Sequence, residues 1–324
     1  MSILVTCGTG FVSRAFVRAL REEHRDLRVL IRDASKVSLF PTEKVLVGDL
    51  FDLSCLRRAV TGVETIVHVP PRVYPNGDVQ SQLAMHRHAH VESTRLLLEL
   101  GVAEGLKKFL FVSSAHATGR DPEKTLCESS GGTPDTPYAQ AKLAAERLIE
   151  SYAERHSIQT VILRPPSIYG PGDKSWVSSL FRAAQRNLWL PLKGIRAAQS
   201  LVFVDNLARA GLALLRVSRN GIGPGVFIVK DREDYRPEDL YAAVCQTLGK
   251  KIKIFQVPLP LLRALAFIGV KFKEMPTLRG LSLFRQLMIP QRYCGHLFDE
   301  TVPDFSYVGL DEALQSMLTK SSAV

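Results

Sequence analysis

The fold is decided near the start of the chain by the stretch Val5-Thr6-Cys7-Gly8-Thr9-Gly10-Phe11-Val12-Ser13. The apolar run from Ile3 to Thr6 predicts a strand, and the pattern from Phe11 to Glu22 predicts a helix. Backbone amides at the start of a helix attract phosphate groups, and glycines let the chain approach them closely. The stretch therefore predicts a strand–turn–helix unit that can bind the phosphates of a nucleotide.

Apolar runs and helical patterns continue to alternate through the first half of the chain. The runs are rich in β-branched and aliphatic residues, as is typical of strands buried on both faces of a parallel sheet. We therefore predict an α/β fold, a doubly wound (Rossmann) sheet that binds ligands at the carboxyl ends of its strands. Further strands are predicted at 28–31, 44–47, 65–69, 108–113 and 160–163, and further helices at 91–100 and 137–156.

The pattern loosens from Arg164 onward, where Pro165-Pro166, Gly170-Pro171-Gly172 and the segment 221–225 interrupt it. Prolines and glycines in such pairs separate short elements. We expect an NAD(P)-binding Rossmann domain over 1–165 and a smaller, mainly helical substrate-binding portion over 166–324. The second portion is expected to interleave with the main sheet.

Composition narrows the class of protein. The 324 residues are 46% hydrophobic and 23% charged, as in an ordinary globular protein. The net charge of +10 comes from dispersed lysines and arginines without a long basic block. Nucleic acid is therefore not expected as a partner, and phosphate-bearing small molecules explain the charge.

The cellular location of the protein is predicted from its first residues, the lengths of its apolar runs and the pattern of its cysteines. No run reaches the roughly eighteen apolar residues of a membrane span, and the first residues have no signal-peptide pattern. Five scattered cysteines without a C-x-x-C pair predict free thiols and a cytoplasmic location. The apolar, basic segment 259–272 favours a helix packed on the core or at a subunit contact of a homodimer over peripheral contact with an anionic membrane.

The type of reaction is predicted from one segment, Pro137-Tyr138-Ala139-Gln140-Ala141-Lys142. Residues four apart share a helix face, so the ammonium of Lys142 can lie beside the phenol of Tyr138. A phenol titrates at about pH 10, and a neighbouring cation favours its ionised form. Ser114, at the end of a predicted strand, can hydrogen-bond a substrate oxygen. The three residues suit proton transfer to or from a hydroxyl or carbonyl while hydride moves to or from a nicotinamide.

Several segments resemble the extended short-chain dehydrogenase/reductase family, in that family's order. Phe111-Val112-Ser113-Ser114-Ala115-His116-Ala117-Thr118-Gly119 is similar to V-S-S-x-x-V-Y-G, and the segment 163–172 is similar to L-R-P-x-x-V-Y-G-P-G. The first turn is similar to T-G-x-x-G-x-x-G, with Cys7 and Ser13 in place of two glycines. The resemblance runs from residue 3 to about 250 and implies an NAD(P)-dependent oxidoreductase or epimerase.

The resemblance also implies roles for single residues. Ser114, Tyr138 and Lys142 would be catalytic, with Tyr138 as general acid or base and Lys142 binding the nicotinamide ribose and lowering the pKa of Tyr138. After the second predicted strand, Arg32 and Lys36 suit the 2′-phosphate of NADP, whereas Asp33 leaves NAD open. The expected cofactor-binding residues are Gly8, Thr9, Gly10, Phe11, Val12, Arg32, Lys36, Asp49, Leu50, Val69, Tyr138, Lys142 and Pro165.

Within the family, the likeness is to sugar-nucleotide 4-epimerases and 4-keto-hexosamine reductases, and rests on Arg72-Val73, Leu190-Pro191-Leu192 and the segment 200–207. It implies action at C4 of a nucleotide-activated sugar. His90 stands where the family has asparagine, and Gln199 where related epimerases have an arginine for the substrate diphosphate. The expected substrate-binding residues are His90, Ala115, His116 and Gln199.

Two other functions stay open. The substrate could be an apolar ketone or alcohol, such as a sterol or a flavonoid, because diphosphate contacts are missing. A non-catalytic dinucleotide sensor or scaffold is a third possibility, motivated by Cys7, Ser13 and Pro70-Pro71. A metal site is not expected: His86, His88 and His90 lie at helical spacing, but no cysteine or carboxylate cluster completes a ligand set.

Overall fold

Seven parallel strands form the main sheet of the computed structural model, which describes residues 2–22, 26–74, 77–130, 133–217, 225–258, 260–261 and 287–321. The strands are β1 (Ile3–Val5), β2 (Leu27–Ile31), β3 (Lys44–Val47), β4 (Thr65–His68), β5 (Lys108–Val112), β7 (Gln159–Leu163) and β11 (Gly225–Phe227). Their order is β11-β7-β5-β4-β1-β2-β3, so the chain reverses direction across the sheet between β1 and β4. Doubly wound sheets bind ligands at such a reversal, and the predicted fold class is confirmed.

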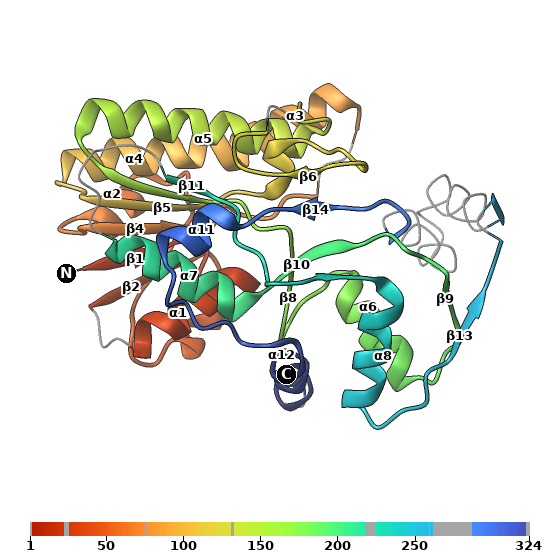
Figure 1. Cartoon of the computed structure of the whole chain (residues 1–324). Coiled ribbons are helices and arrows are strands. Elements are labelled where there is room, and N and C mark those ends of the chain that lie inside the picture. Colours follow the sequence, from red (N-terminus) through yellow and green to blue (C-terminus); the bar gives the residue numbers. More distant parts are fainter. Residues whose placement is uncertain are drawn as a thin grey trace.

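Helices cover both faces of this sheet (Figure 1). They are α1 (Phe11–Glu22), α2 (Leu53–Val60), α4 (Ser93–Ala103), α5 (Pro137–His156) and α7 (Val204–Arg216). In β1, Ile3 and Val5 join the apolar cluster that includes α1 and α7, and Leu4 joins the cluster of α2, α4 and α5. Burial on both faces explains why the strands are continuous apolar runs in the sequence.

Several predicted elements keep their predicted bounds. The helix α5 begins where the sequence indicates, because the Thr136 hydroxyl accepts a hydrogen bond from the Ala139 amide at 3.2 Å and Pro137 occupies the first turn. The helix predicted at 91–100 is longer: α3 (Val79–Arg87) leads into a π turn, His88–Glu92, and then into α4. A π turn of this kind often marks a functional site.

The second half of the chain contains short elements, most of which lie beyond one end of the sheet (Figure 1). They are β8 (Ser167–Tyr169), α6 (Trp176–Gln185), β9 (Leu190–Lys193), β10 (Gln199–Phe203), β12 (Asp234–Tyr235), α8 (Pro237–Thr247), β13 (Ile254–Gln256), β14 (Arg292–Tyr293), α11 (His296–Thr301) and α12 (Leu310–Ser321). β11 pairs with β7 although it follows most of these elements in sequence. Of the segment 259–272, all but residues 260 and 261 lies outside the described residues.

Two of the five cysteines form a disulfide, so the prediction of free thiols throughout is wrong. Cys127 and Cys294 are bonded across a sequence separation of 167. The pairing follows from β6 (Thr125–Leu126), which lies parallel to β14 with Leu126 opposite Tyr293, so the next residue of each strand meets its counterpart. Cys7, Cys55 and Cys245 are free thiols. Among the described helices, none has the length and apolar character of a membrane span.

Candidate active site

The first turn is built around an unusual backbone conformation. Cys7 has φ +51°, in the left-handed region that glycine adopts without strain, and its carbonyl accepts a hydrogen bond from the Gly10 amide at 2.8 Å. A side chain in this conformation costs about 1–2 kcal/mol. Burial raises the pKa of the Cys7 thiol to about 12, so the thiol stays protonated and unreactive at neutral pH.

Two neighbouring cavities open at the carboxyl ends of the strands. The larger, ≈ 800 Å³, runs from the N-terminus of α1 to Tyr138 and Lys142. The smaller, ≈ 400 Å³, lies over the ends of β2 and β3, and Arg32 and Asp49 line it. Both cavities touch Gly10 and Pro71-Arg72-Val73. The pair forms one elongated site of the kind that a dinucleotide requires.

Tyr138 and Lys142 lie on the face of α5 that borders the larger cavity. Lys142 is 3% exposed, its Nζ donates a hydrogen bond to the Val112 carbonyl at 2.9 Å, and it lies 5.7 Å from the centroid of the Tyr138 ring. Ser114, 9% exposed, follows β5 and interacts with the Tyr138 phenol. The spacing predicted from the sequence therefore brings these three side chains together.

The pKa of Tyr138 shifts in the direction opposite to the one expected. Burial raises the pKa of the Tyr138 phenol, while the hydrogen bond with Ser114 and the charge of Arg72 act against that shift. The expected lowering of the Tyr138 pKa by Lys142 is not found: burial is the largest effect on this phenol, and the effects that oppose it come from Ser114 and Arg72. Burial also lowers the pKa of Lys142 to about 7, although the carboxylate of Glu146 opposes the change.

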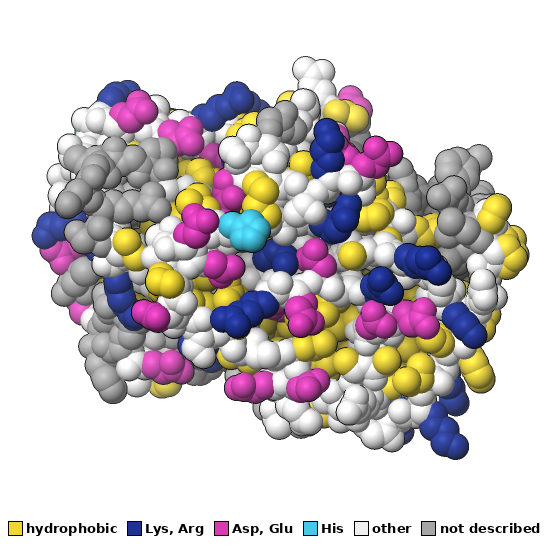
Figure 2. Space-filling view, in the orientation of Figure 1, with side chains coloured by type: hydrophobic (Ala, Val, Ile, Leu, Met, Phe, Trp, Pro, Cys, Tyr) yellow, Lys and Arg dark blue, Asp and Glu magenta, His cyan; other side chains and the backbone are white. Residues whose placement is uncertain are grey.

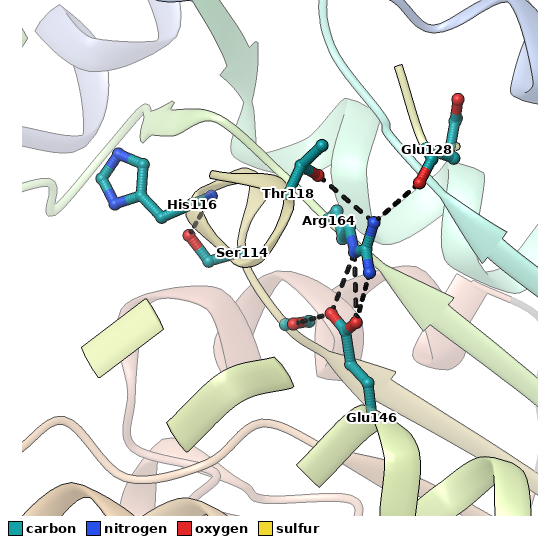
Figure 3. A network of polar contacts seen from close by, with 7 residues as sticks. Ser114, His116, Thr118, Glu128, Glu146 and Arg164 are labelled. Carbon is teal, nitrogen blue, oxygen red and sulfur yellow. Dashed lines mark hydrogen bonds and ion pairs between the residues drawn. The ribbon is translucent and has the colours of Figure 1, made fainter. Parts of the chain in front are cut away.

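A buried ion pair holds the end of β5 in place (Figure 3). Arg164 and Glu146 are 7% and 1% exposed, and Arg164 Nη2 lies 2.6 Å from Glu146 Oε2. Ser113 donates a hydrogen bond to the same carboxylate, and Arg164 donates one to Thr118 Oγ1 at 3.2 Å. The pair therefore ties α5 and β7 to the chain on both sides of Ser114.

Three histidines of α3 and the π turn divide between the two cavities: His86 and His90 line the larger cavity, and His88 lines the smaller one. His86 and His90 stack at 5.5 Å, and each presents an edge-to-face contact to Tyr138, also at 5.5 Å. His88 points elsewhere, stacks on Phe51 at 4.0 Å and lines the smaller cavity. The three rings do not converge, and the described residues contain no group of three metal-ligating side chains.

The larger cavity contains polar atoms that suit a bound dinucleotide. Among the described residues, Ser13 Oγ, Arg14 Nε and His90 Nδ1 are buried without a hydrogen-bond partner, and all three residues line this cavity. The N-terminus of α1 adds backbone amides, and a Cβ at Gly10 would come within 3.1 Å of the Cys7 carbonyl. These donors fit a nicotinamide dinucleotide with its diphosphate at α1.

Most expected cofactor residues border one of the cavities. Lys36 does not, because it lies on the exposed turn Ala34–Leu39, whose cap is the side chain of Asp33. Gly8 is buried against Val29, where any Cβ would overlap Cγ1. The carbonyl of Pro165 accepts the Ala115 amide at 2.8 Å, and its neighbour Pro166 lines the larger cavity instead. The lining residues from the expected set are Thr9, Gly10, Phe11, Val12, Arg32, Asp49, Leu50, Val69, Tyr138 and Lys142.

Of the residues expected to bind substrate, one lines a cavity and three do not. His90 lines the larger cavity, but Ala115, His116 and Gln199 line neither. Gln199 is 3% exposed and donates a hydrogen bond to the Ile289 carbonyl at 2.8 Å. His116 lies 3.4 Å from Gln291 Oε1, and burial lowers its pKa to about 4.

Four basic residues that line the larger cavity were not among the expected site residues. Arg14 lies one turn after Gly10 in α1, with its guanidinium against Gly172, where a Cβ would come within 2.9 Å. Helical spacing from Gly10 could have indicated this residue. Arg72, His86 and Lys174 also line the larger cavity, and Arg72 lies 5.0 Å from the centroid of the Tyr74 ring.

The profile of the NAD dependent epimerase/dehydratase family matches residues 3–229. The chain belongs to this family. It is an NAD-dependent oxidoreductase or epimerase of the extended short-chain dehydrogenase type.

Individual relatives agree with this family but differ in reaction. The UDP-glucose 4-epimerase of Vibrio cholerae is 26% identical over 80% of this chain and 79% of its own length. The 3 beta-hydroxysteroid dehydrogenase/Delta 5-->4-isomerase of Mycobacterium tuberculosis is 26% identical over 81% of this chain and 73% of its own. The UDP-glucose 4-epimerase of Thermus thermophilus, solved with NAD, has a TM-score of 0.74 at 20% identity, over 100% of both chains. That structural likeness concerns the fold.

Proposed function

We propose that this enzyme is an NADP-dependent reductase or epimerase that acts at C4 of a nucleotide-activated sugar, with Tyr138 as general acid or base. One observation carries the proposal. Tyr138 and Lys142 line the end of a cavity that begins at the N-terminus of α1, and Ser114, which lines neither cavity, interacts with the Tyr138 phenol. A dinucleotide with its diphosphate at α1 would extend towards Tyr138.

The bound dinucleotide supplies or accepts the hydride. In the reductive direction, Tyr138 donates its phenolic proton to the substrate oxygen, and Ser114 holds that oxygen by a hydrogen bond. In the oxidative direction, Tyr138 accepts the proton of the C4 hydroxyl. The phenol of Tyr138 is protonated at neutral pH, and burial raises its pKa further, so the free enzyme holds the proton that the reductive direction requires.

The preference for NADP rests on Arg32. It lines the smaller cavity at the end of β2, where a ribose 2′-phosphate would lie. Asp33, the acidic alternative, accepts hydrogen bonds from both the amide and the hydroxyl of Ser35, so its carboxylate is engaged at the cap of a turn. With Asp33 engaged in this way, Arg32 is the side chain at the end of β2 that favours the phosphorylated dinucleotide.

A second candidate substrate is an apolar ketone or alcohol. The steroid dehydrogenase relative is as similar to this chain as the sugar epimerase is. Gln199, at the position of a diphosphate-binding arginine, is buried against the Ile289 carbonyl rather than placed in a cavity. Pro70 and Pro71 give the larger cavity an apolar wall between its two ends.

The proposal is tested by incubating the purified protein with NADPH and either UDP-4-keto-hexosamines or 3-keto steroids. Oxidation of NADPH with the sugars alone supports the first function, and oxidation with the steroids alone supports the second. Failure with both, in protein that still binds NADPH, would reject both substrate classes.

A further inference from the structure

A two-stranded arm lies far from the main sheet (Figure 1). It consists of β9 and β13 with the residues before each strand, 186–193 and 250–256, and we call it the β9–β13 arm. The strands are parallel, with Ile254 opposite Leu190, and the Leu190 amide donates a hydrogen bond to the Lys253 carbonyl at 2.9 Å.

Four large apolar side chains of this arm are exposed. Trp189 is 62% exposed, Ile252 53%, Leu188 47% and Phe255 42%. Alternation along the strands explains part of this set, because Leu190 and Ile254 pack against the core and Trp189 and Phe255 therefore point the other way. Single exposed apolar residues are ordinary, but four on one short arm indicate a contact surface.

The same arm is basic. Arg186, Lys193, Lys250, Lys251 and Lys253 belong to it. The sequence has no aspartate or glutamate between residues 174 and 204 or between 240 and 273. At the edge of the arm, Glu238 accepts a hydrogen bond from the Gly194 amide at 3.1 Å. Figure 2 shows yellow and dark-blue side chains together along this edge of the molecule.

We propose that the β9–β13 arm docks on an anionic phospholipid surface. Tryptophan favours the level of the lipid headgroups, and short apolar side chains bury themselves at the acyl boundary. Each cation near such a surface strengthens binding about five-fold. An apolar protein partner would bind Trp189 and Phe255 without requiring five cations, so charge complementarity selects the membrane surface.

The two tryptophans give a direct assay. Trp176 is 4% exposed in the core and Trp189 lies on the arm, so a change in emission reports Trp189. The probe is a vesicle of phosphatidylcholine with phosphatidylglycerol, compared with phosphatidylcholine alone. We expect a blue shift and protection from acrylamide with the anionic vesicles only, reversed by high salt. Neither substrate nor cofactor is needed, so the result is independent of the proposed function.

Two double variants distinguish an effect of the arm's own cations from an effect of the protein's net charge. Lys250→Ala with Lys251→Ala is expected to weaken vesicle binding about 25-fold, at about five-fold for each cation. Arg57→Ala with Arg58→Ala removes the same charge from exposed positions on α2 and is expected to leave binding within about two-fold. Equal weakening by both variants, or unchanged Trp189 emission with anionic vesicles, would overturn the proposal. Dimerisation that protects Trp189 without lipid would also overturn it, by assigning the arm to a subunit contact.

Discussion

The two edges of the active-site cleft depend on different kinds of information. On the catalytic edge, Tyr138 and Lys142 take their positions from one helix, and Ser114 from the end of a neighbouring strand. The positions expected to bind substrate, which we call the substrate edge, line neither cavity: Gln199 and His116 are held by contacts with Ile289 and Gln291, 90 and 175 residues away in sequence. Local periodicity therefore fixes the positions of Tyr138 and Lys142, whereas long-range pairing fixes the positions of Gln199 and His116.

The largest expected effect is on the catalytic edge. Glu146→Gln leaves Arg164 buried without its counter-ion and is expected to lower the free energy of unfolding by about 3–5 kcal/mol. The matched control is Glu99→Gln, which breaks an exposed pair with Arg95 and should cost less than about 1 kcal/mol. Urea unfolding measures both. Equal losses would show that the buried pair does not hold this edge together.

The substrate edge is tested through its disulfide. Reduction of Cys127–Cys294 is expected to cost about 2–4 kcal/mol, because the bond closes a long loop of the unfolded chain. Denatured protein should react with a thiol reagent at Cys7, Cys55 and Cys245 before reduction, and at all five cysteines afterwards. A variant with Cys127→Ser and Cys294→Ser should lose no further stability in reductant. Five reactive thiols in unreduced protein would contradict the pairing.

At the cofactor end, Arg32→Ala is expected to weaken NADPH binding about ten-fold and leave NADH binding unchanged, because one charge-assisted contact to the 2′-phosphate is lost. Lys36→Ala is the control, since Lys36 lies outside both cavities. Titration of nicotinamide fluorescence measures the four affinities. A larger effect from Lys36 than from Arg32 would move the phosphate site to the exposed turn.

A further expected effect concerns the pH dependence of stability and His90, which lies beside Tyr138. Burial lowers the pKa of His90 to about 2 from 6.5, so below pH 6.5 the unfolded chain takes up a proton that the folded chain does not. Stability is therefore lost as pH falls, by about 1.4 kcal/mol per pH unit for this residue. His90→Asn should make the decline between pH 6 and pH 4 shallower by about that slope. An unchanged slope would place His90 in contact with water.

The features that could be predicted from the sequence are those that depend on local patterns. The sheet, α1 and α5 were predictable because each is encoded by a contiguous local pattern. The π turn at His88–Glu92 was not, since helical periodicity does not reveal a change in hydrogen-bond register. The Cys127–Cys294 bond was not predictable either, because only the pairing of β6 with β14 brings the two residues together.

For the expected catalytic residues, relative positions were more predictable from the sequence than pKa values. Residue spacing placed Tyr138 beside Lys142, but it could not give the degree of burial that raises the pKa of Tyr138 and lowers that of Lys142. Arg72, which acts on Tyr138 from the loop after β4, has no local pattern that indicates its position. Burial and loop position are tertiary properties, which a single sequence pattern does not contain.

The role of Tyr138 is tested most directly by Tyr138→Phe, which removes the phenolic oxygen and keeps the ring against His86 and His90. The measurement is a single turnover of bound NADPH with whichever ketone class the wild-type enzyme reduces, alongside NADPH affinity. We predict unchanged affinity and hydride transfer slowed about 10²–10⁴-fold, the usual contribution of a positioned general acid. Hydride transfer within a few-fold of the wild-type rate would contradict the role of Tyr138 as proton donor.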